Sequence, residues 1–426
     1  MTQESTSKEA LRDYALEPVP LEKRRSLFGT FTVWAGWVMS ITAFLVGGLV
    51  GGGLPLSKAI PAIVLGNFVL ACVGTLMGYL GYKTGISTYL ISRLVFGKRG
   101  SLIISAYIGF LAMGFVGVFA GATGTFIQGY YKAAPLALGA FVFTVMVVST
   151  ALYGFKGLEY LSKIAVPLMW LLAILGLWKV SQTVPGGLGA VAAIVPEKSV
   201  TFWFGMTLAI STWITGASMT ADVGRYAKKS WHVAAGAFGG WLCGAAFLEC
   251  ISAVTALAIG QGDVVLVMIE LGLFWPAIII FFAAMWTSGD NNLYSFSLAF
   301  SNFAHIFKKE DTFTKPRLVF IGGVIVFIGA VLGLYAQFRS FLLTIAITVP
   351  PIAGVFISKL YLTGRYKSTE ELTKQLEKAP SMDYIAFAAW IVGAAVAYFY
   401  KAGSPALNGL VVSVVVYYIL RVVAKK

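Results

Sequence analysis

Residues 281–302 read FFAAMWTSGDNNLYSFSLAFSN. The stretch is long enough to cross a bilayer as a helix, because a span needs about 20 mostly apolar residues. Its ends are apolar and aromatic, but its middle holds two hydroxyls, Thr287 and Ser288, followed by Gly289, Asp290 and two asparagines. Polar groups at this depth are costly in lipid, so they are expected to face the interior of a helix bundle and to carry function.

The composition of the whole chain is that of a membrane protein. Of its 426 residues, 58% are hydrophobic and 12% are charged, and the mean hydropathy is +0.83. Soluble proteins carry about 25% charged residues, so a water-soluble globule could not bury this much apolar surface. Apolar stretches recur to the end of the chain. We therefore expect a cytoplasmic tail over residues 1–27 and a single transmembrane domain over 28–424.

Charge-poor stretches long enough to span a bilayer divide this domain into twelve predicted helices. Region 184–198, which contains PGGLGAVAAIVPEK, is apolar but short and rich in glycine and proline, and it is predicted to be a loop. The twelve predicted segments are 29–53, 57–82, 101–129, 134–155, 163–183, 200–221, 231–259, 274–302, 317–337, 340–362, 382–400 and 404–422.

The basic residues set the expected orientation. With twelve spans both termini lie on one side of the membrane, and that side collects 26 of the 32 lysines and arginines. Because cytoplasmic loops carry the excess of Lys and Arg, both termini are expected in the cytoplasm, and the protein in a plasma or inner membrane. The net charge of +14 then mostly reflects the lysines and arginines that orient the protein in the membrane. Nucleic acid is therefore not an expected partner. The N-terminal tail has no apolar core beside its positive charges, so no cleavable signal peptide is predicted.

Two predicted segments contain residues that weaken a helix. Segment 29–53 has Gly36 in its interior and a glycine-rich end, and segment 200–221 carries Gly216 among several serines and threonines. Glycine costs about 1 kcal/mol in a helix interior. Interrupted helices at matching positions in two halves point to the binding site of a transporter built on inverted repeats. The alternative is that small residues let neighbouring helices pack closely.

No pattern typical of an enzyme active site is evident. The three cysteines lie in apolar segments without metal-ligand spacing, and the two histidines lie near segment ends. Because neither a nucleophile–base pair nor a metal cluster can be found, no catalysis and no cofactor are expected. A channel or uncoupled facilitator and a substrate-sensing receptor on a transporter scaffold are the alternatives to a transporter.

Four motifs, in this order, resemble the nucleobase–cation symporter family 1, and within it the bacterial cytosine permeases. They are GGLVGGGL (47–54), GYLGYKTGISTYLISRLVFGKRGS (78–101), TADVGRY (220–226) and WTSGDNNLY (286–294). The resemblance implies an all-α, leucine-transporter-like fold with twelve transmembrane helices. Two inverted repeats of five helices would occupy 28–183 and 200–362, with helices 1 and 6 broken at mid-membrane. Two accessory helices would occupy 382–422.

The same resemblance implies a secondary active transporter. It would import a nucleobase, either cytosine or a related purine or pyrimidine, by sodium-coupled symport and alternating access. Its partners would be the nucleobase, sodium as the coupling ion and the lipid bilayer, and a monomer would suffice. Within the family the alternatives are a proton as coupling ion, or another small heterocycle such as hydantoin, allantoin or a vitamin precursor.

The hydroxyl pair of the opening stretch falls at the family's cation-ligand positions. By resemblance, Thr287 and Ser288 would bind sodium together with the backbone carbonyls of Ala284, Gly36 and Met39. Carbonyls freed by an unwound helix are expected ligands for a coupling ion in such transporters. The residues alone favour the alternative, in which both hydroxyls bond back to their own helix.

A site for a flat, amide-like base needs aromatic faces, and stacking on one is worth roughly 1–3 kcal/mol per base. By resemblance, Trp213 and Phe115 would supply these faces, with Thr212 and Thr215 at polar positions beside Trp213. The alternative for either ring is packing in the core or against lipid.

The chain departs from the cytosine permeases at three positions of this site. Those proteins have tryptophan at the position of Phe115, a base-reading glutamine at that of Ala112, and asparagine at that of Gly289. Because a lost donor or acceptor changes which substrate fits, a larger purine or a modified pyrimidine could occupy the space at Ala112.

Several ionisable residues lie within or beside the predicted spans. Asp290 is expected to support the site, to touch substrate or to carry a proton, with the adjacent asparagines or a helix break near Gly289 as partners. Glu249 is expected to be a paired structural acid. Asp222 and Arg225 are expected to form a local ion pair or a cytoplasmic gate, unless their side chains snorkel to the interface.

Overall fold

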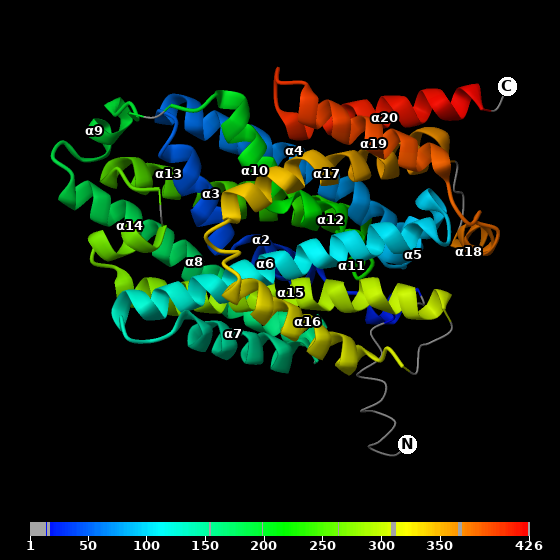
Figure 1. The fold of residues 1–426 in the computed structure, drawn as a ribbon, viewed down its shortest axis with the longest axis horizontal. Helices are drawn as coiled ribbons and strands as arrows, with labels where there is room; N and C mark the ends of the chain where they lie inside the picture. The colour runs from blue at the N-terminus through cyan, green and yellow to red at the C-terminus, as the bar shows by residue number, and fades with distance from the viewer. Residues whose placement is uncertain are drawn as a thin grey trace, which may run out of the picture.

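The computed structural model describes residues 14, 18–152, 155–197, 199–262, 264–307, 312–364 and 369–424. Over these residues its regular secondary structure is helical, apart from one isolated β-bridge. The helices, in chain order, are η1 (Leu21–Lys23), α2 (Leu27–Val38), α3 (Ile41–Gly51), α4 (Leu56–Thr84), α5 (Thr88–Phe96), α6 (Gly100–Tyr130), α7 (Leu136–Ala151), α8 (Phe155–Thr183), α9 (Gly187–Ala193), α10 (Phe202–Ser218), α11 (Ala221–Gly224), α12 (Ser230–Phe238), η2 (Gly239–Ala246), α13 (Phe247–Ile259), α14 (Val264–Glu270), α15 (Phe274–Ile306), α16 (Lys315–Val331), α17 (Phe338–Ile357), η3 (Ser358–Thr363), α18 (Thr369–Glu377), α19 (Tyr384–Phe399) and α20 (Pro405–Val423). Figure 1 shows them as an elongated bundle. We call the end that holds the start of α2 and the end of α20 the terminal end, and the end that carries α9 and α14 the distal end.

Every one of the twelve predicted segments coincides with one or more of these helices. In the described part of the chain, five helical runs are long and apolar enough to span a membrane alone: α4, α6, Ser230–Ile259, Phe338–Thr363 and α20. Two bent pairs raise this number to seven, namely α2 with α3 at 50° and Pro167–Thr183 with α9 at 89°. The chain is therefore a multi-pass membrane protein, and the count of twelve spans stays a prediction.

The break in the first segment lies beyond Gly36, which is inside α2. Only Met39 and Ser40 separate α2 from α3. The Oγ of Ser40 accepts the N–H of Thr42 at 3.3 Å and so caps the start of α3. Serine is a preferred N-cap residue, which explains why the second helix begins here rather than at the glycine.

The sixth segment is not interrupted at the residues that we predicted. α10 continues through Gly216 as one helix to Ser218, and α11 begins after a two-residue turn. The hydroxyls of Ser211 and Thr212 donate to the carbonyl of Leu208 at 3.0 and 2.8 Å. These two hydroxyls are thus satisfied within α10 and leave its backbone hydrogen bonds intact.

Two other predictions, the loop over 184–198 and the break near Gly289, are wrong, and a short helix lies between the second and third predicted segments. Region 184–198 contains α9, which begins after Gly186 turns the chain with φ 83°. The stretch 78–101 contains α5, where the N–H of Leu90 lies 3.4 Å from the Oγ of the N-cap residue Ser87. α15 has no break at its middle glycine and is one helix of 33 residues.

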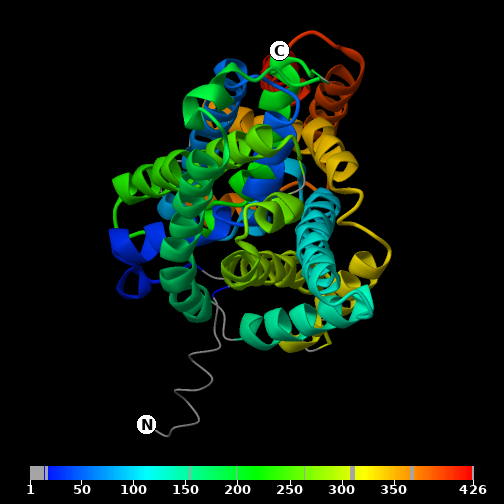
Figure 2. The same cartoon turned by 90° about the vertical axis from the view of Figure 1, so that its left-hand side faces the viewer.

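The centre of the bundle is formed by α3 and α10. Ten of the eleven residues of α3 are buried, and α3 packs against α13, α10 and α4. Figure 2, which looks at the distal end, shows the other helices arranged around α3 (blue). α6 packs against α15 and α7, while α19 and α20 pack against α17 at one side. The polar middle of α15 is thereby placed against the break between α2 and α3.

The terminal end of α4 packs directly on the backbone of α11. An added Cβ at Gly81 would lie closer than 3.0 Å to the carbonyl oxygen of Ala221, and one at Gly224 equally close to that of Gly78. Because backbone atoms cannot move aside alone, we expect Gly81→Ala to lower the free energy of unfolding by about 1–3 kcal/mol. The measurement is thermal unfolding of the purified protein.

The matched control for this substitution is Gly189→Ala in α9. No atom lies within 4 Å of a Cβ added there, and alanine is the better helix former. We expect the control to leave the unfolding temperature unchanged or to raise it. Equal destabilisation in the two variants would contradict the close packing of α4 on α11.

Candidate cation and substrate site

Two hydroxyls of α15 reach the end of α2. The Oγ1 of Thr287 lies 3.0 Å from the carbonyl oxygen of Gly36 and 2.9 Å from that of Ala284. The Oγ of Ser288 lies 2.9 Å from the carbonyl oxygen of Trp37 and 3.4 Å from that of Gly36. Both side chains are fully buried. The hydroxyls therefore join α15 to α2 rather than bonding only within their own helix.

The last carbonyls of α2 can accept hydrogen bonds from α15 because α2 ends at Val38. The last carbonyls of an α-helix lack an N–H four residues ahead. The N–H of Ser40, which would serve Gly36 in a longer helix, lies 3.1 Å from the carbonyl of Val38 instead. Three carbonyl oxygens and two hydroxyl oxygens thus converge without any fixed charge. Such a set of hard oxygen ligands suits a coupling cation.

Four of the five predicted cation ligands meet here: Gly36, Ala284, Thr287 and Ser288. Met39 stands at the break, and its N–H bonds to the carbonyl of Ala35. Ser288 lies closer to the carbonyl of Trp37, at 2.9 Å, than to that of Gly36, at 3.4 Å, and Trp37 is not among the predicted ligands. Ser40 could have pointed to Trp37. A serine N-cap at position 40 implies that the preceding helix ends just before it, so that the carbonyls of residues 36 and 37 lack an N–H four residues ahead.

The two predicted aromatic residues face each other in the structure. The rings of Phe115 on α6 and Trp213 on α10 are parallel to within 4°, with centroids 5.9 Å apart. Trp37 meets Trp213 edge-on at 6.0 Å, and Phe341 of α17 meets Phe115 edge-on at 5.1 Å. Gly216 makes room for this cluster, since a Cβ there would lie 3.0 Å from the Trp213 ring.

The spacing of the two rings decides what they can hold in this conformation. A base between two parallel rings needs about 7 Å between them, because each stacking contact takes about 3.5 Å. The planes of Phe115 and Trp213 are at most 5.9 Å apart. A base could stack on one of these rings, or lie between them after they separate.

Two residues of the aromatic cluster and one threonine of α10 carry unpartnered polar atoms. Within the described residues, the Nε1 atoms of Trp213 and Trp37 and the Oγ1 of Thr215 are buried without a hydrogen-bond partner. The hydroxyl of Thr212, by contrast, donates to the carbonyl of Leu208 at 2.8 Å. Buried polar groups nearly always have partners. The two indole N–H donors, which belong to the aromatic cluster itself, suit a flat, amide-like ring.

Gly289 and Asp290 point to a different neighbour. A Cβ at Gly289 would lie 3.1 Å from the side chain of Val147 on α7. The Oδ1 of Asp290 accepts from the Oγ1 of Thr150 at 3.0 Å, and this Oγ1 accepts from the Nε1 of Trp286 at 2.8 Å. The predicted partners of Asp290, the asparagines and a helix break, are therefore wrong. The structure does not bring this pair of residues to the aromatic cluster.

Ala112, the remaining predicted substrate residue, is fully buried on α6, one turn before Phe115. Its methyl group offers neither a donor nor an acceptor. At this position, any selectivity for a substrate therefore rests on shape.

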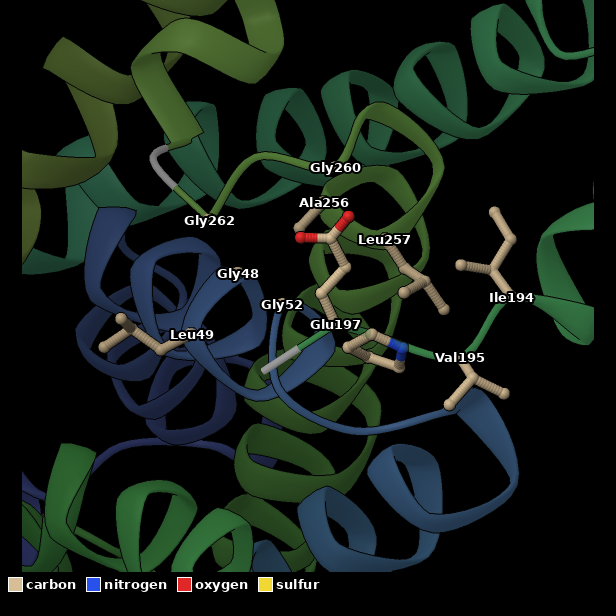
Figure 3. A pocket seen from close by; sticks show the side chains of 11 residues that line it. Gly48, Leu49, Gly52, Ile194, Val195, Glu197, Ala256, Leu257, Gly260 and Gly262 are labelled. Atoms are coloured by element: carbon tan, nitrogen blue, oxygen red, sulfur yellow. The ribbon is translucent and has the colours of Figure 1, made fainter. Parts of the chain in front are cut away.

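Two cavities open the distal end around α3. The larger, of about 680 Å³, is lined by residues of α3, α13 and the segment after α9, and Glu197 projects its carboxylate into it (Figure 3). The smaller, of about 220 Å³, lies between α3 and the start of α17 and includes Arg339. Leu49 and Gly262 line both. None of the predicted site residues lines either cavity.

A buried polar cluster closes the terminal end. Arg225 donates to the hydroxyl of Tyr294 at 2.9 Å and to the carbonyl of Tyr14 at 2.7 Å. The Oδ1 of Asp222 accepts the N–H of Thr88, the first residue of α5, at 2.7 Å. Burial raises the pKa of Asp222 to about 6, although the charge of Arg225 and the bond from Thr88 lower it. The cluster ties the chain before α2 to α5, α11 and α15.

Comparison with known proteins identifies the family. Residues 18–420 match the family described as "Permease for cytosine/purines, uracil, thiamine, allantoin". The chain belongs to this family. The permease is similar to the cytosine permease of Escherichia coli (strain K12), with 29% identity over 385 residues that cover 90% of this chain and 88% of that protein. The family predicted from the four motifs is confirmed, and the permease is a transporter and not an enzyme.

Solved structures show the same fold. Mhp1, a nucleobase-cation-symport-1 family transporter in a closed conformation with bromovinylhydantoin bound, superposes with a TM-score of 0.82 at 18% identity, covering 96% of this permease and 95% of that chain. A Na⁺-coupled sialic acid symporter in a substrate-bound outward-open state gives 0.69 at 14% identity, covering 98% and 92%. The predicted all-α transporter fold is thereby confirmed.

Proposed function

We propose that this permease imports a nucleobase, either cytosine or a related purine or pyrimidine, by sodium-coupled symport. The observation that carries the proposal is the convergence of Thr287 and Ser288 on the carbonyls of Gly36 and Trp37. The contact lies where α2 ends, so a cation held there would fix the first helix against α15. Binding of sodium and closure of the site around the base would then favour each other, as symport requires.

The aromatic cluster supports the substrate class. Trp213 and Phe115 offer ring faces, and the free Nε1 of Trp213 and hydroxyl of Thr215 offer edge contacts. These groups lie on α10 and α6, and Trp37 links them to the end of α2 that carries the cation ligands. The small side chain of Ala112 favours a larger purine or a modified pyrimidine over cytosine itself.

The transport cycle that follows is alternating access. Twelve spans would form two inverted repeats over 28–183 and 200–362, with accessory helices over 382–422, and helices 1 and 6 would be interrupted at α2/α3 and α10/α11. In this conformation the polar cluster around Arg225 closes the terminal end, which would face the cytoplasm. The distal cavities would face the outside of a plasma or inner membrane. A single chain contains every group that this cycle uses.

A ligand panel tests the proposal. Thermal unfolding of the detergent-purified protein would be measured with cytosine, uracil, adenine, guanine, hypoxanthine and hydantoin, each in sodium or in choline. A ligand at 100 times its Kd stabilises the folded state by about 2.7 kcal/mol. We expect at least one of these heterocycles to stabilise the protein in sodium and much less in choline. Stabilisation that is equal in both salts would contradict sodium coupling, and no stabilisation by any compound would contradict the substrate class.

A further inference from the structure

A buried acid lies outside the site described above. Glu249 of α13 is fully buried, and so is Asn67 of α4 beside it. The Nδ2 of Asn67 donates to the Oε2 of Glu249 at 2.7 Å and to the carbonyl of Ile63 at 3.0 Å. The second bond fixes the orientation of the amide, because a flipped Asn67 would turn its oxygen toward another acceptor.

Two oxygen atoms of the Glu249–Asn67 pair lack a hydrogen-bond partner. Within the described residues, the Oε1 of Glu249 and the Oδ1 of Asn67 are both buried without a hydrogen-bond partner. If Glu249 were ionised, both atoms would be unsatisfied acceptors, and a bare charge would stand in the apolar interior, which is costly. The nearby hydroxyl of Ser252 cannot help, since it donates to the carbonyl of Phe44 at 2.5 Å.

Among the described side chains, no lysine or arginine on the helices packed against α13 forms an ion pair with this acid. α3 and α9 carry no ionisable residue, and Cys250 is the ionisable neighbour on α13 itself. On the other elements that pack against α13, counting α8 from residue 167 on, the ionisable groups whose side chains the structure describes are Lys58, Cys72, Tyr79, Tyr82 and Lys83 on α4, Lys179 on α8, Cys243 on η2 and Glu270 on α14. Among the described side chains, the only hydrogen bond or ion pair to the carboxyl of Glu249 is the bond from Asn67.

We propose that Glu249 and Asn67 form a proton-binding site between α13 and α4. With a proton on Oε1, the acid donates a hydrogen bond to the Oδ1 of Asn67 while the amide donates to Oε2. A single proton then gives both Oε1 and Oδ1 a hydrogen-bond partner. A sodium ion would need several oxygen ligands, whereas among the described side chains this pair offers two unpartnered oxygens, Oε1 and Oδ1. The site is a neutral acid–amide pair inside the bundle.

The position of α3 connects this site to transport, a link that rests on the proposed function. A Cβ at Gly47 would lie closer than 3.0 Å to the carbonyl of Glu249 and to the side chain of Ser252, so the backbone of α3 seals this face of α13. When α3 moves during alternating access, the acid gains a path to water and exchanges its proton. Uptake then depends on pH through Glu249.

Infrared spectroscopy tests proton binding without any transport assay. In the full-length protein at neutral pH, we expect Glu249→Gln to remove a protonated-carboxyl absorption band. Glu377→Gln, at an exposed position on α18, should leave that band in place. Asn67→Leu keeps the acid and should shift the band, because the amide partner is lost. A spectrum in which Glu249→Gln removes only an ionised-carboxylate band, or in which Asn67→Leu has no effect, would overturn the proposal.

Uptake into proteoliposomes tests the link to transport. At constant sodium, we expect the wild type and Glu377→Gln to share one pH profile, and Glu249→Gln to lose it. An unchanged profile in Glu249→Gln would overturn the link. A band that sodium abolishes in the wild type would show that the site takes the ion instead of the proton. If no nucleobase is transported at all, the proposed function fails while the infrared result still decides the proton site.

Discussion

Thr287→Ala is expected to raise the sodium concentration for half-maximal uptake by about 10- to 100-fold. The variant loses one hydroxyl that contacts the carbonyl of Gly36 at 3.0 Å. A hydrogen bond or ligand contact to a charged group is worth about 1.5–3 kcal/mol, and each 1.4 kcal/mol is a factor of ten in affinity. Since Thr287 is fully buried, water cannot replace the lost oxygen without rearrangement. The measurement is initial uptake rate against sodium concentration at saturating substrate.

The control for this substitution must remove a hydroxyl from a similar helix. Ser149 on α7 donates to the carbonyl of Met146 within its own helix and contacts no other element through that bond. Ser149→Ala should therefore keep the sodium dependence of the wild type. Ser288→Ala should act like Thr287→Ala, and the double variant should cost less than the sum because both hydroxyls serve one ion. Unchanged sodium dependence in Thr287→Ala would remove the cation site from α15.

The contact between α15 and the end of α2, where we propose the cation site, shows what a sequence can and cannot predict. The pattern of apolar stretches located every helix that carries the site, because a membrane span must be long and apolar. The position of the break was harder to predict from the sequence. A glycine costs a helix only about 1 kcal/mol, and α2 continues through the buried Gly36. The break falls at Met39 and Ser40, where a serine cap satisfies the start of α3. The contact of Ser288 with the carbonyl of Trp37 was missed for the same reason.

The second limit on prediction is that a sequence motif does not show which way each of its side chains points around the helix. Thr287 and Ser288 point to α2, but Gly289 and Asp290, adjacent in sequence, point to α7. Successive residues of an α-helix are rotated by about 100°, so a four-residue motif faces two different neighbours. The motif therefore located the site on α15, but it could not assign each of its residues to the site.

Trp213→Ala is expected to weaken substrate binding by about 10- to 100-fold. The residue presents a ring face to Phe115, and loss of one stacking face costs roughly 1–3 kcal/mol per base. The same ring packs against Trp37, so its removal should also loosen the end of α2 that carries the cation ligands. We therefore expect the apparent affinity for sodium to fall as well. The measurements are the Kd for the stabilising heterocycle and its dependence on sodium.

Two further variants separate stacking from hydrogen bonding and from general destabilisation. Trp213→Phe keeps a ring but loses the unpartnered Nε1, so it should retain part of the affinity and change which heterocycle binds best. Trp178→Ala removes a tryptophan that is 54% exposed on α8 and should leave binding unchanged. Because the rings of Phe115 and Trp213 are too close to admit a base, substrate that lies between them must move Trp213 and change its fluorescence, a signal that Trp213→Phe would remove. Wild-type affinity in Trp213→Ala, with the protein folded, would show that the base binds elsewhere and that the aromatic pair is only a part of the core.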